Sequence, residues 1–125
     1  VRREVALALH GNTSPQATAL WVELARQHDG KDRWYLEALG MGADAHWDET
    51  LAAWLKVAGD SWNTPGGRDL IWRSRAKATP ALLVKIVKDP GTPESERARY
   101  LRAFDFLRGP ERDAALLELV SLPPK

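Results

Sequence analysis

The sequence predicts an all-α chain of stacked helix hairpins, and three observations lead to this fold class. Apolar residues recur with the spacing of a helix face, Pro and Gly signals mark where helices start and stop, and one helical segment occurs more than once. No segment sustains the alternation of apolar and polar residues that a half-buried strand needs. We therefore expect about seven to eight short helices with short connections.

Dipeptides that start helices recur along the chain. A Ser or Thr side chain can cap the free N–H groups of a first turn, and a following Pro presets the first helical φ. This pattern occurs at Ser14-Pro15, Thr79-Pro80 and Thr92-Pro93, with Gly109-Pro110 as a near relative. Stop signals follow apolar stretches at Gly11, Gly30, Gly59 and Gly109, where a left-handed residue is favoured. Residues 59–68, rich in Gly, Asn, Asp and Pro, predict a loop.

The expected helices follow in chain order from these signals. Residues 1–10 form the first, and residues 15–28 the second, with the apolar stripe Ala17, Leu20, Trp21, Leu24 and Ala25. Next come residues 31–41, and then 46–58 with Trp47, Leu51, Trp54, Leu55 and Ala58. After the expected loop lie residues 68–76, and then 80–88 with Leu82, Leu83, Ile86 and Val87. The last two helices are 94–108, with Ala98, Leu101 and Phe104, and 110–121, with Leu116, Leu117 and Val120.

An internal repeat predicts how these helices are arranged. The segment Trp34-Tyr35-Leu36-Glu37-Ala38-Leu39 matches Arg99-Tyr100-Leu101-Arg102-Ala103-Phe104, and the two tyrosines are 65 residues apart. This offset equals two steps of about 32 residues, each holding two helices, as in helical-hairpin solenoids. The second helices of the hairpins would be 1–10, 31–41, 68–76 and 94–108. The ends of such a row should expose apolar side chains, at Val5, Leu7 and Leu9 and at Leu116, Leu119 and Val120.

Length, charge and composition exclude several classes of protein. The chain has 125 residues, enough for about one domain spanning residues 1–125. It starts with Val1-Arg2-Arg3 rather than Met, which suggests a fragment of a larger multidomain protein. The absence of cysteine excludes disulfides, thiolate zinc sites, a cysteine nucleophile and covalently attached haem. No apolar run approaches the roughly 18 residues of a membrane span, so we expect no membrane insertion.

Histidines and acids do not form a convincing metal site. The segment 44–49 contains Asp44, His46, Asp48 and Glu49, but His46 lies about 200° around a helix from either aspartate. We interpret Asp44 as a cap of the following helix, and Asp48 and Glu49 as acids favourably placed in its first turn. His10 and His28 fall near helix ends, where solvated or capping roles are expected.

The sequence also offers no clear catalytic group. Ser74 lies between Arg73 and Arg75 without a motif that would expose a nucleophile. Asp105, between Phe104 and Phe106, is the one acid with apolar neighbours, and pairing with an arginine is the expected outcome. We therefore predict that the chain is not an enzyme and holds no cofactor or metal in this segment.

The basic residues gather in the middle of the chain. Residues 66–88 carry six basic side chains and one acidic one, although the whole chain has a net charge of only +1. The candidate partner-binding surface in this block consists of Arg68, Trp72, Arg73, Arg75 and Lys77. The alternative, which we favour, is that these cations pair with carboxylates of adjacent repeats. A protein partner is expected, and nucleic acid is not, because specific nucleic-acid binders present a strongly basic face.

Six tryptophans are many for a chain of this length. Packing between hairpins is their expected use, because each indole buries a large area and its N–H readily finds a carbonyl. Ligand stacking is the alternative for Trp34 and Trp62.

Three stretches resemble a known family: residues 33–43 (RWYLEALGMGA), 67–76 (GRDLIWRSRA) and 99–107 (RYLRAFDFL). They are similar to the helical-repeat region of large planctomycete-type haem-binding proteins, a group that includes membrane-bound dehydrogenase-like chains. In that family HEAT-type repeats follow a propeller resembling sugar dehydrogenases and precede a c-type cytochrome module. The resemblance implies a HEAT-like α-solenoid that acts as a spacer or docking scaffold in an extracytoplasmic protein, and it implies no site residue here.

Three functions remain as hypotheses, the third being an enzyme fragment that uses His46 with nearby acids. The first is a non-catalytic HEAT-like scaffold or protein-interaction module within a larger, haem-binding redox protein. The second is a HEAT-like DNA-binding domain of the DNA-repair glycosylase type, which combines a solenoid with Trp, Arg and Asp on a concave basic face. The near-neutral charge and the short chain argue against the second hypothesis.

Overall fold

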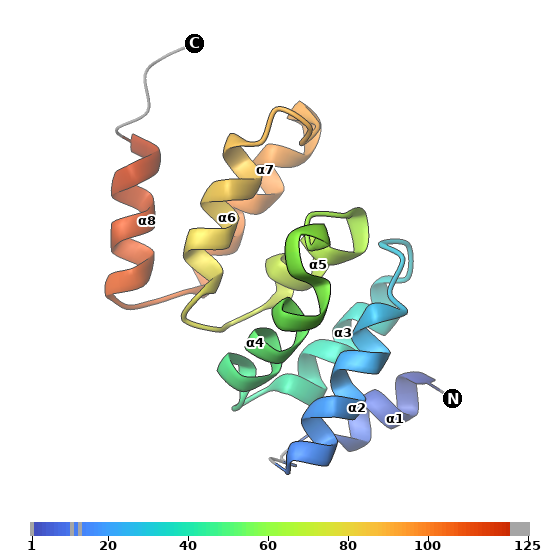
Figure 1. Cartoon of the computed structure of the whole chain (residues 1–125). Coiled ribbons are helices and arrows are strands. Elements are labelled where there is room, and N and C mark those ends of the chain that lie inside the picture. The colour runs from blue at the N-terminus through green and yellow to red at the C-terminus, as the bar shows by residue number, and fades with distance from the viewer. Residues whose placement is uncertain (1, 11, 13, 121–125) are drawn as a thin grey trace. The chain divides into compact units, whose positions relative to one another are not determined.

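Eight α-helices and no strand form the part of the chain that the computed structural model describes, namely residues 2–10, 12 and 14–120 (Figure 1). The predicted all-α class is therefore confirmed. The helices are α1 (Arg2–Ala8), α2 (Pro15–Arg26), α3 (Arg33–Ala43), α4 (Trp47–Ala58), α5 (Pro65–Arg73), α6 (Thr79–Lys88), α7 (Glu94–Ala103) and α8 (Pro110–Val120), with 3₁₀ turns η1 (Gly59–Ser61) and η2 (Phe104–Phe106). None of these helices combines the length and the apolar character needed to cross a bilayer.

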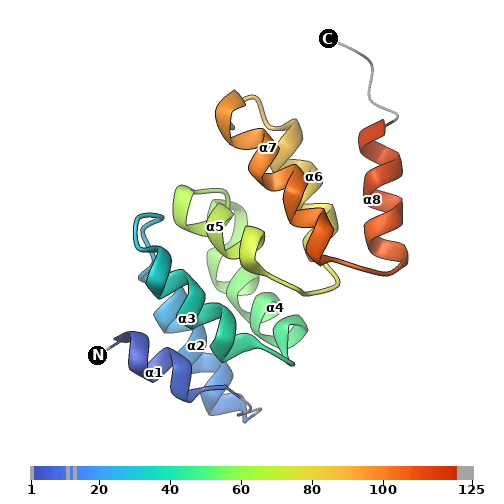
Figure 2. The same ribbon diagram turned by 180° about the vertical axis from the view of Figure 1, so that it is seen from behind.

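The chain divides into two compact units, Val1–Ala76 and Lys77–Lys125. In the first unit, α1 packs beside α3 and α3 beside α5, while α2 packs beside α4 and also contacts α3. Figures 1 and 2 show this unit from opposite sides, with α2 and α4 in front in one view and α1, α3 and α5 in front in the other. The first unit thus consists of two layers of helices. In the second unit, α6 packs against both α7 and α8.

Large aromatic side chains join the two layers of the first unit. Trp21 of α2 is 1% exposed, and its indole N–H donates a hydrogen bond to the Leu39 carbonyl of α3 at 2.9 Å. The edge of its ring meets the ring of Trp47, with 5.7 Å between centroids. Tyr35 of α3 donates from its hydroxyl to the Leu24 carbonyl of α2 at 2.6 Å. These contacts confirm that packing is the use of Trp21 and Trp47.

A glycine allows α1 to lie close against α3. A Cβ added at Gly42 would collide with the carbonyl oxygen of Ala6. Ala6 itself is fully buried, so α1 has no room to withdraw without uncovering core surface. Gly42 is therefore a packing residue rather than a flexible one.

The predicted helix starts hold in part. Ser14 caps α2 as expected, because its hydroxyl accepts from the Ala17 N–H, and α8 begins at Pro110. Thr79 and Thr92 do not cap: α6 begins at Thr79 with no side-chain cap, and the Thr92 hydroxyl donates to the Ile86 carbonyl at 2.7 Å. The expected loop over residues 59–68 is wrong at its end, because α5 starts at Pro65 under a cap from Thr64.

Three of the four predicted stop glycines have a positive φ: Gly30, Gly59 and Gly109. Gly59 directly ends α4, whereas Gly109 precedes α8 rather than ending α7. Gly11 lies outside the described residues. The positive φ of these three glycines was thus predicted correctly, but only Gly59 directly ends a helix.

Burial agrees with the predicted stripes in the middle helices and departs from them elsewhere. In α2, α4 and α6 most stripe residues are buried, although Leu20 is exposed. Leu101 of α7 and Leu117 of α8 are exposed, because these helices bury other positions, such as Tyr100 and Ala115. Six apolar residues at the two ends of the row were expected to be exposed. Leu7 and Val120 are exposed, and Leu9 is buried. The other three, Val5, Leu116 and Leu119, are half-buried.

Candidate functional site

The predicted partner-binding surface is distributed over α5 and the residues that follow it. Arg68, Trp72 and Arg73 lie on α5 and are half-buried, and Arg75 follows two residues after the helix ends. Lys77 is exposed and belongs to the second unit. The structure therefore brings four of the five residues together within one unit.

The arginines of this group are bonded within the first unit. Arg73 Nε lies 3.5 Å from Glu37 Oε1 of α3, with the arginine side chain 18% exposed, as the predicted pairing between neighbouring repeats requires. Arg68 donates to the Asn63 side-chain oxygen at 3.1 Å. Arg75 donates to the carbonyls of Arg73 and Ser74 at 2.8 and 3.1 Å, which closes the end of α5. Burial lowers the pKa of Arg75, nearby Arg73 lowers it further, and Glu37 opposes the change.

His28 forms a buried polar pair that sequence reasoning missed. Its Nε2 donates to Asp69 Oδ2 of α5 at 2.8 Å, and the two side chains are 0% and 12% exposed. The expected solvated or capping role of His28 is therefore wrong. The pair joins the segment after α2 to α5, and its members are 41 residues apart in the sequence. The other ring nitrogen, Nδ1, is buried without a hydrogen-bond partner.

Glycines bring His28 and Asp69 together. Helix α2 ends at Arg26, and the chain turns at Gly30, where φ is +85°. A Cβ added at Gly66, in the first turn of α5, would collide with the His28 carbonyl oxygen. The loop after α2 therefore lies directly against the start of α5, one helical turn before Asp69.

A hollow of about 300 Å³ opens beside His28, also in the first unit. Three carboxylates line it, from Glu4, Asp29 and Asp32, together with Gln27, Tyr35 and the guanidinium of Arg2. The guanidinium carbon of Arg2 lies 5.7 Å from the centroid of the Tyr35 ring, and Arg2 donates to Gln27 Oε1 at 2.6 Å. Acceptor groups thus outnumber donors around this hollow.

Tyr35 forms the aromatic wall of the hollow and stays a neutral phenol. Burial raises the pKa of Tyr35, Arg2 opposes the rise, and Asp32 adds to it. Its hydroxyl is bonded to the Leu24 carbonyl, Arg2 lies over its ring, and the residue is only 7% exposed, so Tyr35 offers little free surface to a ligand.

The acidic segment at the start of α4 does not gather metal ligands. No group of three or more His, Cys, Asp or Glu side chains that could hold a metal occurs in the described residues. Asp48 and Glu49 lie in the first turn of α4 as predicted. The predicted capping role of Asp44 is wrong: its carboxylate accepts from the Ala45 N–H at 3.1 Å, and Ala45 has a φ of +71°. This left-handed residue moves the start of α4 out of reach of Asp44.

His46, which precedes α4, is buried and makes no side-chain cap bond. A second hollow, of about 290 Å³, is lined by residues of this segment and by Arg75. The hollow mixes three carboxylates with a guanidinium that already bonds to backbone carbonyls. It therefore offers no uniform chemistry to a ligand.

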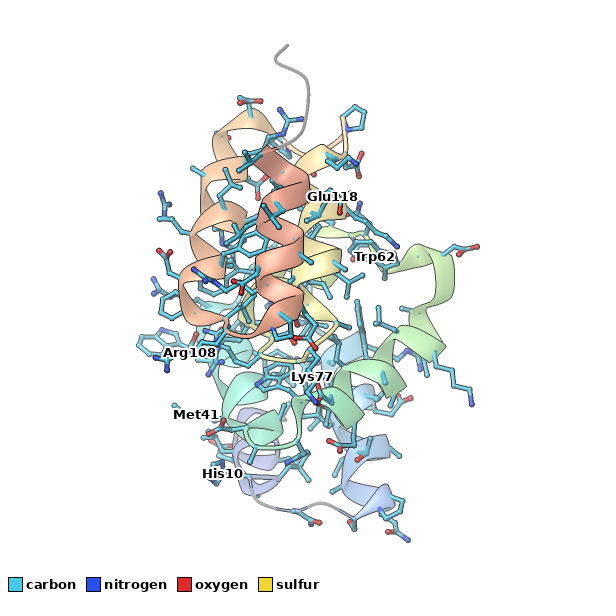
Figure 3. The ribbon with its side chains drawn as sticks, turned by 90° about the vertical axis from the view of Figure 1, so that its left-hand side faces the viewer. His10, Met41, Trp62, Lys77, Arg108 and Glu118 are labelled. Atoms are coloured by element: carbon cyan, nitrogen blue, oxygen red, sulfur yellow. The ribbon has the colours of Figure 1, made fainter. Side chains whose placement is uncertain are left out.

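The remaining candidate residues have structural positions. Ser74 is fully buried, and its hydroxyl accepts from the Ala76 N–H at 3.1 Å. Asp105 is exposed in η2, so its apolar neighbours in the sequence do not bury it. His10 Nδ1 donates to the Met41 carbonyl in the last turn of α3 at 2.9 Å, and Figure 3 shows the two residues next to each other. His10 thus has the capping role that was predicted, on a neighbouring helix.

Two tryptophans remain available to a ligand. Trp34 is 72% exposed at the start of α3, and Trp62 is half-buried after η1. The other four are buried or half-buried in the first unit. Ligand stacking at Trp34 or Trp62 stays the untested alternative to packing.

Comparisons of this chain with protein-family models, with curated proteins and with solved structures found no match.

Proposed function

We propose that the chain is a non-catalytic, HEAT-like helical-repeat scaffold that presents a surface to a protein partner or to neighbouring domains of its parent chain. One observation carries this proposal: helices that alternate along the chain pack side by side, α1 with α3, α3 with α5, α2 with α4, and α6 with α8. Helical-hairpin solenoids stack in this way, since each hairpin buries its apolar face only against its neighbours.

The roles of the chemistry-bearing side chains support a scaffold. His28 joins α5 to the segment after α2, and the Ser74 hydroxyl accepts a backbone hydrogen bond. Arg73 pairs with Glu37, so much of its charge is already engaged between α3 and α5. His28 and Arg73 thus hold neighbouring elements together, and Ser74 shapes the turn after α5.

We further propose that the parent is a haem-binding redox protein, as the resemblance of residues 33–43, 67–76 and 99–107 implies. Haem attachment through cysteine would belong to other segments of that parent, because this chain contains no cysteine. In this proposal the chain spaces or docks the redox domains and takes no part in electron transfer.

Two measurements on the full chain test the scaffold proposal. The chain is used to select peptides from a random displayed library, and a labelled DNA duplex is titrated by anisotropy at low and at moderate salt. A protein-interaction scaffold should enrich peptides reproducibly, and its DNA signal should stay flat. The variant with Arg73→Gln and Arg75→Gln should remain helical by circular dichroism and at most weaken peptide binding. DNA binding that falls steeply with salt, without peptide enrichment, would instead support the DNA-repair type of domain.

A further inference from the structure

We draw no further inference here: the strongest candidate, the surface patch that the exposed side chains of Trp34 and Met41 form on one face of α3, carries none because nothing in the structure shows what covers it.

Discussion

Replacing Asp69 with alanine removes the carboxylate that accepts from His28 Nε2 at 2.8 Å and leaves a buried imidazole without a partner at either nitrogen. The two side chains are 0% and 12% exposed, so solvent screens their interaction little. Leaving the buried His28 N–H without its acceptor costs about 2 kcal/mol of unfolding free energy. The double variant His28→Leu with Asp69→Leu should lose less unfolding free energy than the single variants His28→Leu and Asp69→Leu lose together. The difference, which is the coupling energy of the pair, should be about 1–2 kcal/mol.

Urea denaturation followed by tryptophan fluorescence measures this loss of unfolding free energy in the first unit, which contains His28 and Asp69. All six tryptophans lie between residues 21 and 72, inside the first unit, whereas far-ultraviolet circular dichroism reports on both units. Comparing the two signals also shows whether the units unfold together. The reasoning fails if Asp69→Ala costs less than about 1 kcal/mol, or if the two single losses simply add.

Two further substitutions test the packing and capping described above, each by the same fluorescence-detected urea denaturation. Gly42→Ala should destabilise the first unit by about 2 kcal/mol, since its Cβ collides with the Ala6 carbonyl. A loss below about 0.5 kcal/mol would show that α1 can yield. Thr64→Ala should cost about 1 kcal/mol, because the hydroxyl accepts from the Gly67 N–H at 3.0 Å, and Thr64→Ser should restore most of it. A Ser variant no better than Ala would argue against the cap.

Start signals predicted a helix correctly where the residues that follow them also favour a helix. Ser14-Pro15 marks the start of α2 in both sequence and structure. Thr64-Pro65 has the same form, yet the two glycines after it favoured a loop over residues 59–68. Those glycines serve contacts instead, because a Cβ at Gly66 or Gly67 would collide with a backbone carbonyl. Composition alone cannot distinguish a glycine that breaks a helix from one that allows a close approach.

The candidate site depended on contacts that sequence spacing does not reveal. His28 and Asp69 are 41 residues apart, and neither has a local feature that identifies the other. The repeat did contain a usable signal: residues 31–41 and 68–76 were expected to be neighbours in one row, which places Glu37 near Arg73, as observed. The hollow beside His28 was not predicted, because it forms where the edge helix α1 meets the loop after α2.

The last two helices show why apolar periodicity overestimates a core. Leu101 and Leu117 fit helical stripes as well as Leu83 does, but only Leu83 is buried. Helix α6 contacts both α7 and α8, so it has neighbours on two sides. A stripe predicts which side chains could be buried, and the number of adjacent helices decides which ones are.

Helix α5 has only nine residues, and its first three are Pro65, Gly66 and Gly67. Glycine costs a helix about 1 kcal/mol relative to alanine, and a helix this short is unstable in isolation. Its stability must therefore come from the loop carrying His28 and from α3, against which it rests. A substitution that displaces residues 27–30 should therefore destabilise α5 as well as the loop itself.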